Sequence, residues 1–176
     1  MDYVEKRKSG TLLYDGKVVK LEVDEVLLSN GEESKREIIR HSGGACVVYE
    51  EEGKIAFVRQ YRYAYGESVI ELPAGKLNKG EDPMLAAQRE LKEETGVWAE
   101  NLTLIHEVYP TPGYTDERLY IYFAGKGKRG ETHLDEDEFL DTLWIDKTKV
   151  KQMLKKGEIK DAKTIIGLYA YFGREK

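Results

Sequence analysis

The stretch GKLNKGEDPMLAAQRELKEETGV, spanning Gly75–Val97, decides the fold and the chemistry of this chain. Asp82 followed by Pro83 is a favourable helix start, because Asp caps free backbone N–H groups and Pro suits the first helical position. Gly96 is a natural helix stop. The stretch therefore predicts a helix over Pro83–Thr95, bounded by loops that glycines allow to turn tightly.

The expected helix has two distinct faces. Apolar residues at helical spacing predict a buried stripe of Met84, Ala87 and Leu91. Carboxylates share another face, formed by Glu90, Glu93 and Glu94. Carboxylates this close raise one another's pKa unless a cation neutralises them, and Arg89 alone cannot balance three. A solvated acidic face is one interpretation, and a divalent-cation site is the other, because hard oxygen ligands suit Mg²⁺ or Mn²⁺.

The spacing of the whole stretch separates these interpretations. It reads Gly75, five residues, Glu81, seven residues, Arg89-Glu90-Leu91, one residue, Glu93-Glu94, one residue, Gly96-Val97. This resembles the Nudix box at each defining position, and so many fixed positions make a chance match improbable. The resemblance implies a loop–helix–loop that holds Mg²⁺ and an enzyme that hydrolyses a nucleoside diphosphate linked to another moiety.

The resemblance also implies roles for individual residues. The implied metal ligands are the carbonyl of Ala74 and the side chains of Glu90, Glu93 and Glu94. Glu93 and Arg89 are expected to take part in catalysis, with Arg89 orienting the glutamates by salt bridges. Glu81 is expected to brace the loop or to bind metal through water.

A general base is expected on a separate loop, and the acidic segment LDEDEFLD (Leu134–Asp141) is the candidate. Aligning the following strand with ADP-ribose pyrophosphatases, which the chain resembles beyond the box, places Glu136 at their catalytic glutamate. Glu138 is the alternative if the register slips by two. A solvated acidic turn is the competing interpretation of this segment.

Three further segments resemble those enzymes and imply ADP-ribose as the substrate, cleaved to AMP and ribose 5-phosphate. SKREIIRH implies that Arg36 binds substrate, and FVRQYRYA implies the same for Arg62, because guanidinium groups pair well with diphosphate oxygens. A surface charge or a strand salt bridge is the alternative for each arginine. PTPGYTDERLYIYFA adds the substrate-binding candidates Pro112, Gly113 and Glu117.

The substrate leaves alternatives open. A GDP-, UDP- or ADP-sugar or a diadenosine polyphosphate would use the same chemistry, and a non-catalytic ADP-ribose-binding module is the third possibility. The first arginine segment has no aromatic residue to stack on adenine. Tyrosines elsewhere are the candidates for that contact: Tyr14, Tyr61, Tyr63 and Tyr65.

The rest of the chain predicts an α+β Nudix fold, a mixed β-sheet sandwiched between helices. Residues 1–40 are expected to form a small antiparallel β unit, with Asn30-Gly31 as its hairpin turn, and residues 41–176 the hydrolase domain. Further strands are expected at 45–49, 55–60, 68–73, 102–109, 119–124 and 139–145, and helices at 147–155 and 161–172. The resemblance implies a homodimer formed through the N-terminal unit.

Composition restricts the partners. The chain has 176 residues, 40% of them apolar and 35% charged, and a net charge of −5. This acidic balance argues against nucleic acid as a partner, and no run approaches a membrane span. We expect a cytoplasmic protein without a signal peptide. The single cysteine, Cys46, is expected to be a buried structural thiol.

Overall fold

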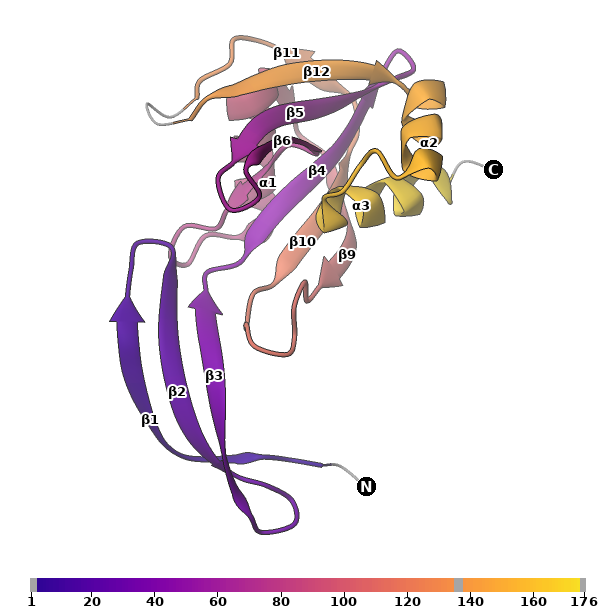
Figure 1. Cartoon of the computed structure of the whole chain (residues 1–176). Helices are drawn as coiled ribbons and strands as arrows, with labels where there is room; N and C mark the ends of the chain where they lie inside the picture. The colour runs from indigo at the N-terminus through magenta and orange to yellow at the C-terminus, as the bar shows by residue number, and fades with distance from the viewer. Residues whose placement is uncertain (1–2, 135–137, 175–176) are drawn as a thin grey trace. The chain divides into compact units, whose positions relative to one another are not determined.

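The computed structural model describes residues 3–134 and 138–174, and Figure 1 shows the arrangement of its elements. The chain forms two compact units. Unit 1 takes in the chain up to Gly43 together with Tyr109–Arg118, and unit 2 takes in Gly44–Val108 and the chain from Leu119 onward. The expected division after residue 40 stays a prediction, and it did not include the return of Tyr109–Arg118 to the first unit.

Unit 1 is a three-stranded antiparallel sheet in the order β1 (Lys6–Asp15), β2 (Val19–Leu27) and β3 (Glu33–His41), which lie side by side in Figure 1. The predicted hairpin between β2 and β3 is confirmed. Gly31 has a φ of 87°, and the Leu28 N–H donates to the Glu32 carbonyl at 2.8 Å. Strand β1 was not predicted, because all ten of its residues are exposed and leave no alternating pattern.

Unit 2 contains a seven-stranded sheet in the order β12-β5-β4-β10-β9, with β6 paired to β5 and β7 to β4. Its strands are β4 (Gly44–Glu51), β5 (Lys54–Arg62), β6 (Glu67–Glu71), β7 (Ala74–Lys76), β9 (Leu102–Val108), β10 (Leu119–Ala124) and β12 (Leu140–Asp146). Strands β4 and β10 run parallel and the other pairs are antiparallel. The short strands β8 (Val97–Ala99) and β11 (Gly127–Arg129) pair separately.

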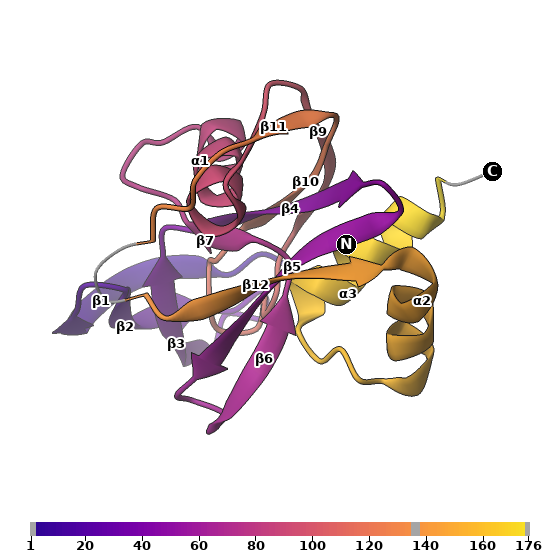
Figure 2. The ribbon, with the colours of Figure 1, turned by 90° about the horizontal axis from the view of Figure 1, so that it is seen from above.

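Helices cover both faces of this sheet, as expected. Figure 2 shows α1 (Pro83–Thr95) on one side and α2 (Lys147–Lys156) with α3 (Ala162–Phe172) on the other. Strand β4 alternates between the two cores, as a strand with both faces buried must. Its residues Ala45, Val47 and Tyr49 join the cluster that contains Leu91 of α1. Cys46 and Val48 join the cluster of α2 and α3.

The structure corrects one detail of the box helix. Its buried apolar side chains are Ala86, Ala87 and Leu91, each fully buried, whereas Met84 is 38% exposed. The sheet therefore covers the helix from Ala86 onward, where small side chains allow close packing, and Met84 in the first turn stays outside. Strands β7, β8 and β11 were also not predicted, because three residues are too few to show a period.

Cys46 is buried in unit 2, as the sequence predicted. Burial raises the pKa of its thiol to about 12. Along the described ranges of the chain, none of the helices combines the length and the apolar character that a membrane crossing would require.

Candidate active site

The box helix begins and ends where the sequence predicts. The Asp82 carboxylate accepts hydrogen bonds from the Met84 N–H at 2.9 Å and from the Leu85 N–H at 3.3 Å. Gly96 closes the helix with a φ of 72°, and its N–H donates to the Lys92 carbonyl at 2.8 Å. Gly130 carbonyl oxygen lies only 2.4 Å from where a Gly96 Cβ would stand, so a side chain is excluded there on two grounds.

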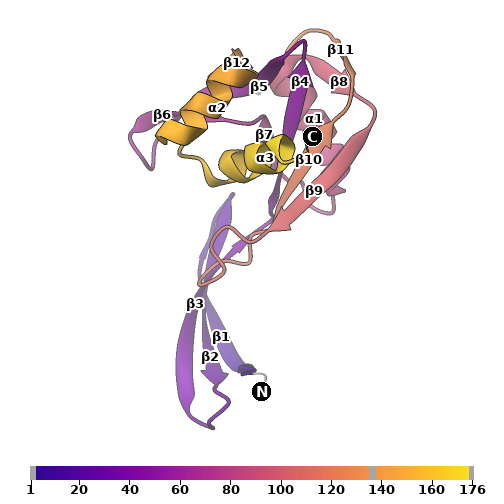
Figure 3. The same cartoon turned by 90° about the vertical axis from the view of Figure 1, so that its right-hand side faces the viewer.

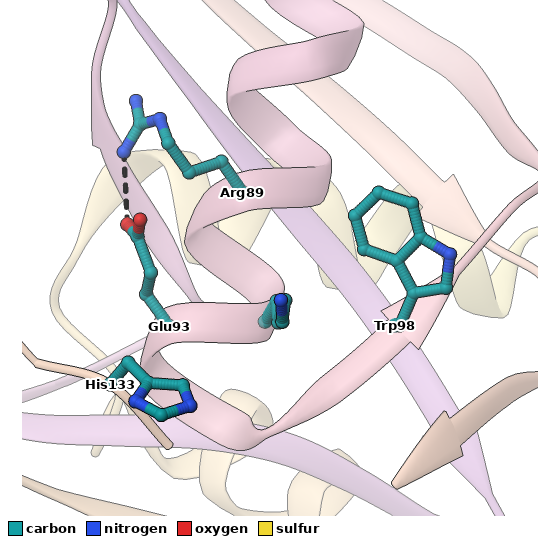
Figure 4. A pocket seen from close by; sticks show the side chains of 5 residues that line it. Arg89, Glu93, Trp98 and His133 are labelled. Atoms are coloured by element: carbon teal, nitrogen blue, oxygen red, sulfur yellow. Dashed lines mark hydrogen bonds and ion pairs between the residues drawn. The ribbon is translucent and has the colours of Figure 1, made fainter. Parts of the chain in front are cut away.

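Arg89 is the centre of a carboxylate network. Its guanidinium donates to Glu81 at 3.0 and 3.1 Å, to Glu90 at 2.7 Å and to Glu93 at 3.0 Å. Figure 4 shows Arg89 and Glu93 reaching toward each other from α1. Binding to Arg89 lowers the pKa of Glu81. Arg89 therefore fixes the directions of three carboxylates and ties the loop before α1 to the helix.

Glu90 is 7% exposed and packs against the backbone of Gly75. A Cβ at Gly75 would lie 2.0 Å from a carboxylate oxygen of Glu90, so only glycine fits at the first position of the box. Burial raises the pKa of Glu90 to about 7, although Arg89 acts in the opposite direction. Glu90 is therefore a desolvated carboxylate with only one cation, Arg89, beside it.

Glu94 is buried further, at 2% exposed. Its carboxylate accepts a hydrogen bond from the Ala74 N–H at 2.9 Å, and its main-chain carbonyl accepts one from the Thr142 hydroxyl at 2.5 Å. Burial raises the pKa of Glu94 to about 8, and the Ala74 N–H opposes this rise only in part. The sequence predicted mutual repulsion among these carboxylates, whereas the larger cause in the structure is burial.

These carboxylates are not a solvated acidic face, because Glu90 and Glu94 are buried. They suit a divalent cation in chemistry, since hard carboxylate oxygens in a site that lacks full positive compensation are what Mg²⁺ binds. Over the described residues, no three or more Asp, Glu, His or Cys side chains are already gathered around one point. Glu90 and Glu93 turn to Arg89, and Glu94 turns to the Ala74 N–H.

The expected general-base segment is described only in part. Glu136 lies outside the described residues. Glu138 is exposed, and its charge contributes to the raised pKa values of both Glu90 and Glu94. The chain that leads to this segment is attached to the box helix, because the His133 N–H donates to the Glu93 carbonyl at 2.9 Å. His133 also lines a pocket with Arg89, Lys92, Glu93 and Trp98, shown in Figure 4.

Arg62 lies at the end of β5 and forms a paired contact with Glu71, with N–O distances of 2.5 and 2.7 Å. Glu71 is 2% exposed and also binds Lys163 of α3 at 2.5 Å. Glu71, Lys163 and Asp161 were missed by the sequence analysis, because residues from β6 and α3 meet only in the folded chain. The structure thus gives Arg62 the strand salt bridge that was its alternative interpretation, and its role toward substrate stays a prediction.

The candidates in unit 1 form a separate group. Arg36 pairs with Glu5 at 2.5 and 2.9 Å and lines a pocket with Pro112 and Gly113. A carboxylate oxygen of Glu117 lies 3.5 Å from Nδ1 of His41. The structure therefore brings Arg36 together with the Pro112–Gly113 turn, although the two are far apart in the sequence.

Main-chain hydrogen bonds explain this grouping. The Ile39 N–H donates to the Tyr114 carbonyl at 2.8 Å, and the Asp116 N–H donates to the Ile39 carbonyl at 3.2 Å. Arg40, which the sequence analysis did not select, lies beside the same pocket and pairs with Glu22 and Asp116. Sequence position alone could not separate Arg40 from Arg36.

Three comparisons with known proteins bear on this site. The profile of the NUDIX domain family matches residues 21–167. The chain is 43% identical over 170 residues to the methanol dehydrogenase activator of Bacillus methanolicus, covering 94% of this chain and 91% of that protein. It is 40% identical over 163 residues to the ADP-ribose pyrophosphatase of Bacillus subtilis, covering 91% and 88%.

A second ADP-ribose pyrophosphatase, from Mycobacterium tuberculosis, is 33% identical over 166 residues, covering 92% of this chain and 80% of that protein. Among solved structures, one titled "Crystal structure of ADP compounds hydrolase" superimposes with a TM-score of 0.84 at 20% identity, covering 96% of this chain and 92% of the other. That likeness confirms the predicted fold. With the complete box and the family profile over most of its length, the chain belongs to the Nudix family.

Proposed function

We propose that this protein is a Mg²⁺-dependent pyrophosphatase that hydrolyses ADP-ribose to AMP and ribose 5-phosphate. The observation that carries the proposal is the complete box, whose Glu90 and Glu94 are buried, in a chain that matches two ADP-ribose pyrophosphatases over more than nine tenths of its length. The names of the relatives indicate the substrate, and the buried carboxylates indicate a bound metal.

The residues that would hold Mg²⁺ are the Ala74 carbonyl and the carboxylates of Glu90, Glu93 and Glu94. When bound there, Mg²⁺ would neutralise charge on the pyrophosphate and would lower the pKa of a water that it binds. Mn²⁺ is the alternative ion, because it accepts the same oxygen ligands. Arg89 keeps Glu90 and Glu93 oriented through its hydrogen bonds at 2.7 and 3.0 Å.

Other residues act on the water and on the substrate. Glu136 or Glu138 takes a proton from the attacking water, and the negative charge of Glu138 already acts on Glu90 and Glu94. Arg62 and Arg36 pair with diphosphate oxygens, exchanging the carboxylates that they now bind, Glu71 and Glu5. Pro112, Gly113 and Glu117 complete the substrate-binding set in unit 1.

A substrate panel tests the proposal. AMP or the corresponding nucleoside monophosphate is measured with ADP-ribose, ADP-glucose, GDP-mannose and diadenosine tetraphosphate as substrates. We expect the highest kcat/KM with ADP-ribose. GDP-mannose belongs in the panel, because a GDP-mannose pyrophosphatase of Citrobacter koseri is 30% identical over 75% of this chain. A higher kcat/KM for any other substrate would overturn the ADP-ribose assignment and keep the hydrolase chemistry.

We also propose a cytoplasmic homodimer that forms through unit 1. All ten residues of β1 are exposed, including Leu12, Leu13 and Tyr14 at 49%, 61% and 59%. An exposed edge strand with apolar side chains is a surface that proteins normally cover. A Leu13→Glu variant should sediment as a monomer where the parent sediments as a dimer, and Lys17→Glu serves as the control. A monomeric parent would refute the dimer.

A second candidate function is activation of a dehydrogenase, as the name of the Bacillus methanolicus relative states. The 43% identity over nearly the whole of both chains favours it. The two functions are compatible if activation uses the hydrolase site. Adding the protein to methanol dehydrogenase should then raise its turnover, and Glu94→Gln should abolish the effect. No change with the parent protein would exclude this second function.

A further inference from the structure

We propose that Thr164, in the first turn of α3, is a positioning residue for the metal-binding segment Leu72–Ala74. The inference rests on the proposed function, because it concerns the segment whose Ala74 carbonyl is an expected metal ligand. Helix α3 lies more than sixty residues beyond the box in the sequence. Figure 3 shows it in front of the sheet, beside β4 and β10.

The segment Leu72–Ala74, which leads from β6 into the first residue of β7, is held at each of its three residues by a different element. The Leu72 N–H donates to the Thr164 hydroxyl oxygen at 2.8 Å, and the Pro73 carbonyl accepts from the Val47 N–H at 2.9 Å. The Ala74 N–H donates to the Glu94 carboxylate at 2.9 Å. Thr164 is thus the contribution of α3 to a three-point attachment that ends at the box.

The Thr164 hydroxyl is itself fixed. Its residue is fully buried, and the hydroxyl donates to the Asp161 carboxylate at 2.6 Å while it accepts from Leu72. Asp161 caps α3 and also accepts from the Thr164 N–H at 3.0 Å. With its hydrogen committed to Asp161, the hydroxyl oxygen can only accept from Leu72, so the direction of this hydrogen bond is determined.

A second contact from α3 reaches the same residue. Leu72 is fully buried, and a Cβ at Gly167 would lie 2.8 Å from its Cδ1 atom. Gly167 therefore allows α3 to approach the Leu72 side chain closely, while Thr164 holds the Leu72 main chain. Two independent contacts from one helix determine where the chain enters the metal-binding segment.

The neighbouring residue is fixed by the same turn of α3. Lys163 binds Glu71 at 2.5 Å and Asp161 at 3.0 Å, and Glu71 binds Arg62. The two cations and two carboxylates balance, which allows this group to be buried. The first turn of α3 therefore sets the position of both Glu71 and Leu72, the two residues that precede the Pro73-Ala74 pair.

The test replaces the hydroxyl while keeping the shape. Thr164→Val leaves the buried Leu72 N–H without its acceptor, whereas Thr164→Ser keeps the acceptor. Leu168→Val is the matched control, because Leu168 is a fully buried residue of α3 outside this hydrogen-bond network. Mn²⁺ affinity is measured by electron paramagnetic resonance on the substrate-free protein, and hydrogen exchange is measured at the Leu72 and Ala74 amides.

We expect Thr164→Val to bind Mn²⁺ about 10-fold more weakly and to exchange both amides faster. Thr164→Ser should restore Mn²⁺ affinity. Leu168→Val should lower the Tm and leave Mn²⁺ affinity unchanged. If Thr164→Val does not fold, Gly167→Ala provides a second perturbation, because its added methyl group pushes on Leu72, and it should weaken Mn²⁺ binding as well.

The outcomes separate the two proposals. Parental Mn²⁺ affinity in Thr164→Val, or in Gly167→Ala where that variant replaces it, would overturn the positioning role alone and leave the hydrolase intact. A parent protein that binds no Mn²⁺ and releases no AMP would overturn the proposed function, and the positioning role with it. Weaker binding in Leu168→Val equal to that in Thr164→Val would also refute the positioning role, because any loosening of α3 would then suffice.

Discussion

Unit 2 buries both faces of its sheet, whereas unit 1 leaves its sheet largely uncovered. In unit 2, Val47 and Val48 are neighbours on β4, and both are fully buried, one on each face. In unit 1, every residue of β1 is exposed. A three-stranded sheet with little buried apolar surface gains little stability from a core of its own. A sheet that helices cover on both faces is stabilised by the apolar core that it forms with them.

The candidate site residues of the two units differ in burial. The carboxylates with strongly raised pKa values, Glu90 and Glu94, belong to unit 2, where burial can perturb them. The candidate Arg36 in unit 1 is held by Glu5, a carboxylate at the surface. The proposed metal ligands therefore lie in unit 2, whereas the candidate Arg36 for substrate binding and the proposed dimer edge lie in unit 1.

The largest effect is expected from the most buried carboxylate of unit 2. Glu94→Gln would remove a proposed metal ligand while keeping the shape, so kcat for ADP-ribose should fall at least about 100-fold. Glu100→Gln, at an exposed position just beyond the helix, is the control and should keep parental kcat. If the protein were an ADP-ribose-binding module, Glu94→Gln would lower its affinity for ADP-ribose and the parent would show no turnover. Parental turnover in Glu94→Gln would refute the metal assignment.

The next prediction compares one arginine from each unit. Arg62→Met and Arg36→Met should each raise KM for ADP-ribose about 10-fold to 100-fold, because each would remove a charged hydrogen-bond donor proposed for the diphosphate. Arg62→Met should also lower the Tm by several degrees, since Glu71 stays buried with one cation fewer. Arg36→Met should leave the Tm unchanged, because Arg36 pairs at the surface.

Kinetics and thermal denaturation of both variants measure this difference. Equal loss of Tm in the two variants would show that the units do not differ in the way their burial indicates. An unchanged KM in either variant would remove that arginine from the substrate-binding set.

A smaller effect is expected in the pH dependence of stability. The folded-state pKa values of Glu90 and Glu94 are raised to about 7 and about 8 by burial. Their contribution to stability is fully present below the unfolded value near 4.5 and is lost as the pH rises through the folded values.

Metal-free protein should therefore lose several degrees of Tm between about pH 4.5 and about pH 8 from these two groups. Glu94→Gln should show a shallower slope over the same range, measured by calorimetry in the presence of EDTA. A slope in Glu94→Gln as steep as in the parent would contradict the raised pKa of Glu94.

The smallest effect is expected at Cys46, which is 1% exposed and has its pKa raised to about 12 by burial. The folded protein should not react with a thiol reagent at about pH 8, because thiolate is the reactive form. The protein unfolded in urea should react with the reagent at one thiol per chain. Rapid reaction of the folded protein would show that the core of unit 2 opens readily.

The sequence predicted the parts of this molecule that local rules determine. The box helix runs over Pro83–Thr95 as expected, because Asp82 and Gly96 act through neighbours a few residues away. Strand β10 likewise covers Leu119–Ala124 as expected. Strand β1 was missed because its residues face solvent, and Met84 was misassigned because periodicity gives the side of a helix but not how far the sheet extends along it.

The residues of the candidate site also fall into those that local spacing indicates and those that only the folded chain brings together. Arg89 and the box glutamates could be selected from their spacing, since they lie on one helix and one loop. The contacts of Glu71 with Arg62 and Lys163, and of Leu72 with Thr164, join segments about ten to more than ninety residues apart. Nothing in a local pattern indicates such pairs, and the burial that raises the pKa of Glu94 depends on the packing of the whole unit.

The central claim is that metal held at the box cleaves ADP-ribose, and one titration tests it most directly. AMP release from ADP-ribose is followed as Mg²⁺ is added to protein freed of divalent ions with EDTA. The account predicts no AMP before the addition and a saturable rise afterwards, absent in Glu94→Gln. AMP release at full rate without any divalent ion, or none at any Mg²⁺ concentration, would contradict it.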